Sequence, residues 1–328
     1  MKEIGGYFEL EHLISNEYHK NLIALNSGRN ALIYILKSKK SKKIKKIYIP
    51  YYLCDSIYNF LKRNGYDYEF YRIKKDFTPK FEKKLNNDEY LYIVNYYGQL
   101  SNEKISNLKK IYKNIIIDNT HSFFQEPLEN IGTVYNCRKW FGVPDGAYLS
   151  TDTKLNESIE KAKSTDKMGH LLGRFENKAS DYYEKFQSND EKFNFEDLKL
   201  MSDLTHNLLG AIDYEKIKNI RNKNYSILDK NLKKYNKLKL NISEVPFCYP
   251  LYIENGAEIR KALIKEKIYI PLLWGNVLDE NEKNSIEYQY AMNILPIPCD
   301  QRYDEEDMRY IIETILKFIK NGEIIYEY

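Results

Sequence analysis

Short apolar runs alternate with amphipathic stretches over the first 150 residues, and this alternation limits the possible folds more than any other feature. The apolar runs predict β-strands at residues 22–25, 47–50, 68–73, 90–95, 115–117 and 147–150. The amphipathic stretches predict helices at residues 31–36, 55–64 and 102–112, with a lysine-rich turn at 39–46. Strands that are separated by helices form βαβ units. We therefore expect an α/β fold with a mostly parallel sheet.

The length of 328 residues indicates more than one domain, since a domain usually has ~100–200 residues. From residue 152 to about 234 the chain is helical and charged in character, with a loop expected at 187–196 and a long helix at 214–235. The remaining pattern predicts strands at 247–253 and 268–270 and helices at 257–265 and 304–320. We expect a large α/β domain with a helical linker over residues 1–235 and a small α+β domain over 236–328.

The composition excludes several classes of protein. Hydrophobic residues make up 43% of the chain and charged residues 30%, which is typical of a folded protein. The 51 basic and 47 acidic residues give a net charge of only +4, without the basic excess of a nucleic-acid-binding protein. No apolar run approaches the ~18–20 residues of a membrane span, and the N-terminus carries acids where a signal peptide needs an apolar core. We expect a soluble cytoplasmic protein that binds neither nucleic acid nor membrane.

The cysteines indicate reduced thiols. The chain has four cysteines, Cys54, Cys137, Cys248 and Cys299. They form no CxxC pair, which argues against a disulfide framework and against a metal site.

Asp118 ends an expected strand of three isoleucines. In a parallel sheet the carboxyl ends of the strands line the ligand crevice, so an acid there is a candidate functional group. The alternative interpretation is that Asp118 caps the following turn.

Lys139 lies among Cys, Trp, Phe, Val and Pro residues. Apolar surroundings and a neighbouring cation both lower the pKa of an ammonium group, which makes the amine a better nucleophile. The alternative is a lysine whose stem packs on a loop while its charge stays in water. Asp118 and Lys139 are 21 residues apart, so both can lie above one edge of the sheet.

One cofactor needs both groups. Pyridoxal 5'-phosphate requires a lysine for its Schiff base and a carboxylate that keeps its ring nitrogen protonated. The stretch 26–32, Asn-Ser-Gly-Arg-Asn-Ala-Leu, supplies a small-residue turn before a helix whose free N–H groups suit a phosphate. The alternative for this stretch is an ordinary turn.

These residues lie within a longer series of motifs. The motifs are Gly-Gly-Tyr-Phe at 5–8, Ser-Gly-Arg-Asn-Ala-Leu at 27–32, Ile-Pro-Tyr-Tyr-Leu-Cys at 49–54, Tyr-Tyr-Gly at 96–98, Ile-Asp-Asn-Thr-His at 117–121, Lys139 six residues before Asp-Gly-Ala, and Leu-Pro-Ile-Pro at 295–298. In this order they resemble the DegT/DnrJ/EryC1/StrS sugar aminotransferases, which are fold-type-I pyridoxal-phosphate enzymes. The resemblance implies a large domain with a mostly parallel sheet and a smaller α+β C-terminal domain.

The resemblance also implies roles for individual residues. Lys139 corresponds to the Schiff-base lysine and proton shuttle, and Asp118 to the partner of the ring nitrogen. His121 stands where the family usually has a glutamine facing the phenolic oxygen; otherwise it is a loop histidine. The residues implied to hold the phosphate are Ser27, Gly28, Arg29 and Asn136, although Arg29 replaces a small hydroxyl residue. Tyr52 is the candidate for stacking on the cofactor ring.

The activity implied is amino transfer, with glutamate as the donor and a keto-sugar, linked to a nucleotide, as the acceptor. The family resemblance also implies a homodimer with active sites at the interface. Related dehydratases carry His at the lysine position, so Lys139 favours transamination. Two alternatives stay open: a non-transaminating, dehydratase-like sugar enzyme with the same cofactor, and a cofactor-less protein that binds or senses sugar nucleotides.

Three further residues have competing interpretations. Arg302 could bind a carboxylate or phosphate of the substrate, or pair with Asp300 at a domain junction. His170 and Arg174 could face the substrate nucleotide, although exposure to solvent is the favoured interpretation.

Overall fold

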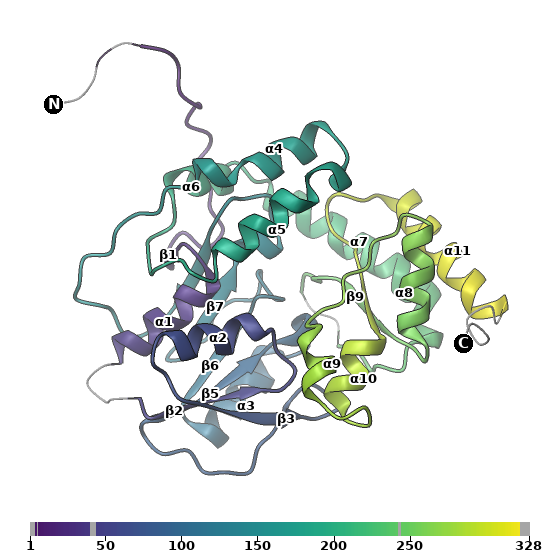
Figure 1. The fold of residues 1–328 in the computed structure, drawn as a ribbon, viewed down its shortest axis with the longest axis horizontal. Coiled ribbons are helices and arrows are strands. Elements are labelled where there is room, and N and C mark those ends of the chain that lie inside the picture. The colour runs from purple at the N-terminus through teal and green to yellow at the C-terminus, as the bar shows by residue number, and fades with distance from the viewer. Residues whose placement is uncertain (1–3, 5, 40–43, 242–243, 322–328) are drawn as a thin grey trace.

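The computed structural model describes residues 4, 6–39, 44–241 and 244–321 (Figure 1). The strands are β1 (Ile23–Leu25), β2 (Lys46–Pro50), β3 (Tyr68–Ile73), β4 (Pro79–Lys80), β5 (Glu89–Val94), β6 (Ile115–Asp118), β7 (Gly132–Asn136), β8 (Ala147–Ser150), β9 (Tyr249–Tyr252) and β10 (Ile294–Ile297). The α-helices are α1 (Gly28–Ser38), α2 (Asp55–Arg63), α3 (Asn102–Tyr112), α4 (Gly169–Glu176), α5 (Tyr183–Lys192), α6 (Asp203–Gly210), α7 (Tyr214–Leu232), α8 (Gly256–Lys265), α9 (Asn276–Glu280), α10 (Ile286–Asn293) and α11 (Glu305–Asn321). Short 3₁₀ turns are η1 (Tyr96–Gly98), η2 (Cys137–Lys139), η3 (Thr165–Lys167), η4 (Ala179–Tyr182) and η5 (Lys233–Tyr235).

The larger sheet has the strand order β1-β8-β7-β6-β5-β2-β3-β4. Its centre is parallel: β2 pairs with β3 and β5, β5 with β6, and β6 with β7. The pairs β1–β8, β7–β8 and β3–β4 are antiparallel. The expected α/β fold with a mostly parallel sheet is therefore confirmed. The carboxyl ends of the central strands meet at one edge, where Asp118 pairs in register with Val94 and Val134.

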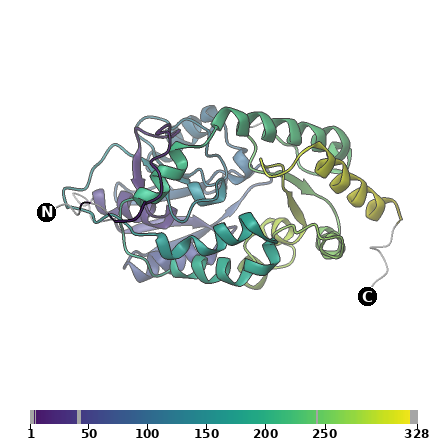
Figure 2. The ribbon, with the colours of Figure 1, turned by 90° about the horizontal axis from the view of Figure 1, so that it is seen from above.

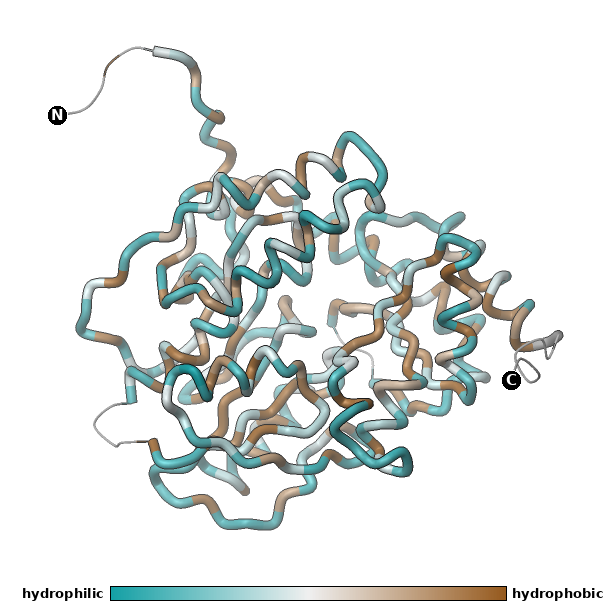
Figure 3. Tube along the Cα trace, viewed as in Figure 1, coloured by the Kyte–Doolittle hydropathy of each residue, from teal (hydrophilic) through white to brown (hydrophobic). Residues whose placement is uncertain are grey.

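Apolar residues explain why the sheet is central. All four residues of β6 are buried, as in a parallel strand that is covered on both faces. In Figure 1, α1, α2 and α5 lie in front of the sheet, and Figure 2 places α7 at the opposite side of the molecule from α5. The hydrophobic colour in Figure 3 gathers on the central strands, where the side chains pack into one core.

The smaller sheet pairs β9 with β10 in antiparallel fashion. Leu228 of α7, Leu263 of α8 and Ile315 of α11 pack with it in a second core. Glu287 of α10 connects this part of the chain to the larger sheet: its carboxylate accepts a hydrogen bond from the Ile73 N–H at 2.8 Å and pairs with Arg72 at 3.1 Å. The division into two domains at residue 235 stays a prediction.

Several expected elements differ from the structure. The loop expected at 187–196 is wrong, because α5 extends to Lys192. The strand expected at 268–270 is also wrong, since these residues join no ladder even though Ile268 and Ile270 are buried. The short strand β7 was not expected. Gly5 and residues 40–43 of the expected lysine-rich turn lie outside the described residues.

Within the described part of the chain, the helices are too short or too polar to span a bilayer.

Gly146 closes the loop that carries η2. Its φ is +114°, and a Cβ there would lie 2.9 Å from Cγ2 of Thr205 and 3.1 Å from Cε of Met201. We expect Gly146→Ala to lower the free energy of unfolding by about 2 kcal/mol or more, because strain and overlap add.

Gly142 provides the matched control for this prediction. It lies in the same loop, and a Cβ there would meet only Leu171 at 3.9 Å, so Gly142→Ala should change stability by less than about 0.5 kcal/mol. Urea unfolding of both variants checks the difference, and equal stability losses would contradict the prediction.

Candidate active site

Asp118 lies buried at the end of β6, 7% exposed. Its Oδ2 accepts a hydrogen bond from the Tyr92 hydroxyl at 2.7 Å, and its Oδ1 accepts one from the Thr120 N–H at 2.9 Å. Burial raises the pKa of Asp118, while these hydrogen bonds and the positive charge of Lys139 act in the opposite direction. Both hydrogen-bond partners are neutral, and no cationic side chain among the described residues forms an ion pair with the carboxylate.

Lys139 is the last residue of η2, which directly follows β7. Its side chain is exposed, whereas those of Cys137 and Trp140 are buried. The expectation that apolar residues surround the Lys139 side chain is therefore wrong. Because a 3₁₀ turn has three residues per turn, Cys137 and Trp140 face inward together and Lys139 faces outward.

The loops after β6 and β7 meet through Trp140. Its indole Nε1–H donates to the carbonyl of Thr120 at 2.9 Å, so the residue after Lys139 is tied to the residue two positions after Asp118. The charge of Lys139 adds to the lowering of the His121 pKa by burial, and it offsets part of the rise that burial causes in the pKa of Asp118. The structure thus brings the amine and the acid to the same edge of the sheet.

His121 is buried in an aromatic stack. The Phe247 ring lies 4.2 Å from the imidazole at an interplanar angle of 7°, and Tyr97 and Trp274 stack at 5.6 and 5.7 Å. Burial, together with the charge of Lys139, lowers the pKa of His121 to about 3. The Nδ1 accepts the Tyr97 N–H at 3.4 Å, which leaves the proton of the neutral ring on Nε2.

Tyr52 does not present a free ring. It is 1% exposed, its hydroxyl lies 3.1 Å from that of Tyr97, and its ring is packed against Trp274 at 4.6 Å and Tyr96 at 5.0 Å. The proposed stacking role of Tyr52 therefore does not fit its position in this structure.

The first turn of α1 lies beside the end of β7. Ser27 caps the helix by accepting the Asn30 N–H at 3.2 Å, and a Cβ on Gly28 would lie 3.7 Å from Nδ2 of Asn136. The other N–H groups that begin the helix have no acceptor within it, an arrangement that suits an anion. Ser27, Gly28 and Asn136 therefore come together as expected. Arg29 is half-buried, and its guanidinium donates to Asn194.

Arg138 is a neighbouring cation that the sequence analysis did not single out. Its Nη2 pairs with Asp190 of α5 at 2.8 Å, and its guanidinium lies 3.8 Å from the centre of the Phe193 ring. The only local signal was its position next to Lys139. Its partners come from a segment that the sequence pattern presented as a loop.

Arg221 of α7 is the second residue that was missed. It is 2% exposed and lies 4.3 Å from the Trp140 ring. It donates to the carbonyls of Pro246 and Phe247, each at 3.1 Å, and to Gln301 at 2.9 Å. Gln301 in turn donates to the carbonyl of Trp140 at 2.8 Å, so α7 and the segment after β10 hold the loop that carries Lys139.

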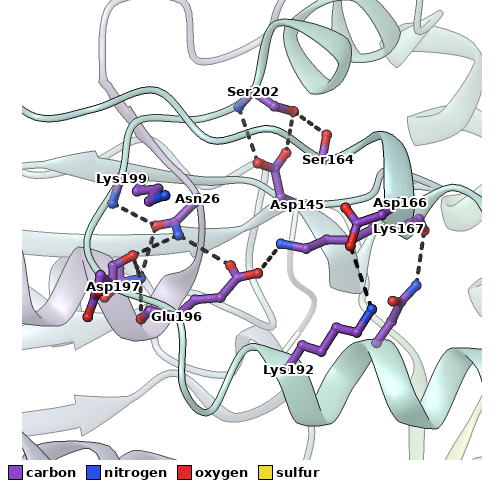
Figure 4. A network of polar contacts seen from close by, with 12 residues as sticks. Asn26, Asp145, Ser164, Asp166, Lys167, Lys192, Glu196, Asp197, Lys199 and Ser202 are labelled. Atoms are coloured by element: carbon purple, nitrogen blue, oxygen red, sulfur yellow. Dashed lines mark hydrogen bonds and ion pairs between the residues drawn. The ribbon is translucent and has the colours of Figure 1, made fainter.

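Asp145 fixes the far end of the same loop. Its buried carboxylate accepts the Ser202 N–H at 3.2 Å and the Ser202 hydroxyl at 2.9 Å (Figure 4). It also accepts a hydrogen bond from the Thr205 hydroxyl. In the same view, Lys167 pairs with Glu196, whose carboxylate also accepts from the amide of Asn26 at 3.4 Å. These contacts tie the start of α1 to the segment that follows α5.

The remaining candidates do not join this site. Arg302 pairs with Asp300 through two hydrogen bonds of 2.7 and 2.8 Å, which agrees with the ion-pair interpretation. The expected exposure to solvent holds for Arg174 but is wrong for His170. His170 is half-buried and hydrogen-bonds to Asn189 at 2.9 Å.

Comparison with known proteins shows the fold. No protein-family model and no curated protein matches the sequence. The DegT DnrJ EryC1 StrS aminotransferase from Brucella abortus matches over 90% of this chain and 85% of that chain, with 14% identity and a TM-score of 0.59. PseC from Helicobacter pylori, an aminotransferase in the biosynthesis of pseudoaminic acid, matches over 91% and 86%, with 17% identity and a TM-score of 0.60.

NtdA from Bacillus subtilis, solved with bound cofactor PMP, matches over 91% of this chain and 73% of that chain, with 16% identity and a TM-score of 0.65. The chain therefore shares the fold of these proteins, and the fold implied by the sequence motifs is confirmed.

The stacked position of His121 predicts how it titrates. Because its pKa falls from 6.5 to about 3, the ring is neutral in the folded protein while the unfolded chain takes up a proton below pH 6.5. The unfolded state then binds more protons, so this residue costs stability as the pH falls from 6.5 towards 3. NMR of the imidazole C–H signals should show no titration of His121 between about pH 5 and 8.

His206 serves as the internal control, since its hydrogen bond to Glu17 raises its pKa above 6.5. A His121 signal that titrates together with that of His206 would contradict the stacked arrangement.

Proposed function

We propose that the protein is a pyridoxal 5'-phosphate-dependent aminotransferase that moves an amino group from glutamate to a nucleotide-linked keto-sugar. The observation that carries this proposal is the convergence of the Lys139 loop with the buried carboxylate of Asp118, beside the first turn of α1. The fold shared with sugar aminotransferases supports it. A homodimer in the cytoplasm belongs to the same proposal.

The chemistry of the residues present fits this cofactor. Asp118 is a buried acid with only neutral hydrogen-bond partners, which suits a protonated ring nitrogen. Ser27, Gly28 and Asn136 surround the N-terminus of α1, which suits a phosphate, and Arg29 adds positive charge there. An exposed amine at Lys139 can reach a ligand held between these groups.

When bound, pyridoxal phosphate supplies an electron sink that stabilises a carbanion at the carbon that loses its proton. Asp118 holds a proton on the ring nitrogen, an electrostatic contribution to this sink. Lys139 would hold the cofactor covalently through Nζ, and once released its free amine would move the proton at that carbon. His121 is neutral with its proton on Nε2, so this N–H would be available to donate a hydrogen bond to the cofactor without adding charge.

A second candidate function rests on Tyr52, whose enclosed ring leaves it unable to stack on a cofactor. This observation favours a cofactor-less protein that binds a sugar nucleotide on the same fold. Such a protein would take up no pyridoxal phosphate, so the experiment with Lys139 below separates the two functions.

Lys139→Ala should abolish the covalent link to the cofactor, because no other amine replaces it at that position. We expect the wild-type protein to gain a visible absorption band with pyridoxal phosphate, and borohydride reduction followed by peptide mass spectrometry to place the label on Lys139. The exposed lysine Lys163 provides the control, and Lys163→Ala should behave as the wild type. A colourless wild type, or a band that persists in Lys139→Ala, would refute the proposal.

Asp118→Asn should slow amino transfer from glutamate by about 100-fold or more, because a neutral amide cannot hold the ring proton. Tyr92→Phe keeps the carboxylate and removes one hydrogen bond, so we expect a smaller loss of about tenfold. Stopped-flow measurement of the decay of the visible band after adding glutamate gives both rates. Equal rates in Asp118→Asn and wild type would show that Asp118 does not act on the cofactor.

A further inference from the structure

Three positive side chains gather around one acid beside the first turn of α1. Arg138 pairs with Asp190 at 2.8 Å. Burial raises the pKa of Asp190, but the charges of Arg138, Lys139 and Arg29 outweigh it and lower that pKa below its ordinary value. Asp55 is a second acid, and its negative charge acts to raise the pKa of Arg29 against the effect of burial. The cluster of Arg29, Arg138 and Lys139 therefore keeps a surplus of positive charge around Asp190.

Asp190 is held in this cluster by the packing of its own segment. Phe193, one turn further along, is fully buried under the guanidinium of Arg138. Asn194 accepts a hydrogen bond from Arg29. The same segment is anchored again where Glu196 pairs with Lys167 (Figure 4). The carboxylate is thus placed among the cations by several independent contacts.

The location of the cluster points to a ligand that carries a phosphate. Arg29 belongs to the first turn of α1, whose leading N–H groups and helix dipole favour an anion. Guanidinium groups bind phosphate oxygens as they bind carboxylates, often through two hydrogen bonds. The Asp190 carboxylate therefore makes the kind of contact that a phosphate monoester would make with Arg138.

We propose that Asp190 is a built-in competitor for a phosphate-binding site formed by Arg138, Arg29 and the N-terminus of α1, and that a phosphate monoester replaces its carboxylate on Arg138. The side chain of Asp190 is 49% exposed, so it can turn towards water when the phosphate enters. The proposal deepens the proposed function, because pyridoxal phosphate is such a monoester, but the exchange of anions requires only the cation cluster.

The test is to remove the competing charge while keeping the shape of the side chain. Asp190→Asn should tighten the binding of inorganic phosphate and of pyridoxal phosphate by about tenfold or more, measured by isothermal titration calorimetry. Asp166→Asn is the matched control: it removes the same charge from a carboxylate that pairs with Lys192 of α5 rather than with Arg138, and it should leave both affinities unchanged. Unchanged phosphate affinity in Asp190→Asn would overturn the proposal.

A double-mutant cycle guards against a change in folding. Circular dichroism verifies that each variant is folded, and adding Arg138→Gln to Asp190→Asn should remove the gain in phosphate affinity. A gain that persists without Arg138 would overturn the proposed exchange.

The outcomes also separate this inference from the proposed function. Tighter phosphate binding in a protein that never forms the covalent link to Lys139 supports the exchange and refutes the aminotransferase. A covalent link that forms with equal cofactor affinity in wild type and Asp190→Asn overturns the exchange and leaves the aminotransferase standing.

Discussion

A buried carboxylate at the end of the central strand β6 is the constraint on which the rest of the site depends. Removing the charge of Asp118 from water is costly, and the neutral Tyr92 hydroxyl and Thr120 N–H compensate only part of that cost. Burial raises the pKa of Asp118, and the charge of Lys139, on the loop after β7, offsets part of that rise. The bond from Trp140 to Thr120 holds the two loops together, so the acid and the amine stay close without a direct ion pair.

Much of the sheet could be predicted because its pattern is local. The isoleucines of β6 and the apolar run of β3 are properties of a few neighbouring residues. The helix α5 could not be predicted in the same way, because its sequence is polar and only Asn189 within it is buried. What holds α5 is tertiary: the ion pair of Asp190 with Arg138 and the burial of Phe193 just beyond its end. The strand expected at 268–270 failed for the opposite reason, because Ile268 and Ile270 are buried but pair with no neighbouring strand.

The sequence was enough to name residues of the candidate site, but it did not reveal how exposed their side chains are or which residues they contact. Motif order was enough to name Asp118, Lys139 and the start of α1, since each lies at the end of a strand or the start of a helix. The exposure of Lys139 depends on a single 3₁₀ turn, which composition does not reveal. The stack of Phe247 on His121 joins residues 126 positions apart, and no local pattern encodes such a contact.

The two neighbours of Lys139 explain how its backbone can be fixed while its amine stays free. Arg138 is bound by Asp190 of α5, and Trp140 is bound by Arg221 of α7 and by Gln301 of the segment after β10. The helices α5 and α7 lie on opposite sides of the molecule in Figure 2. Lys139 lies between these two anchors with an exposed side chain. In the proposed function Lys139 first holds a ligand and then carries a proton, and this combination suits that role because the backbone stays fixed while the amine changes partner. The costly burial of the Arg221 charge is then understandable, since its contacts position the loop rather than bind the ligand.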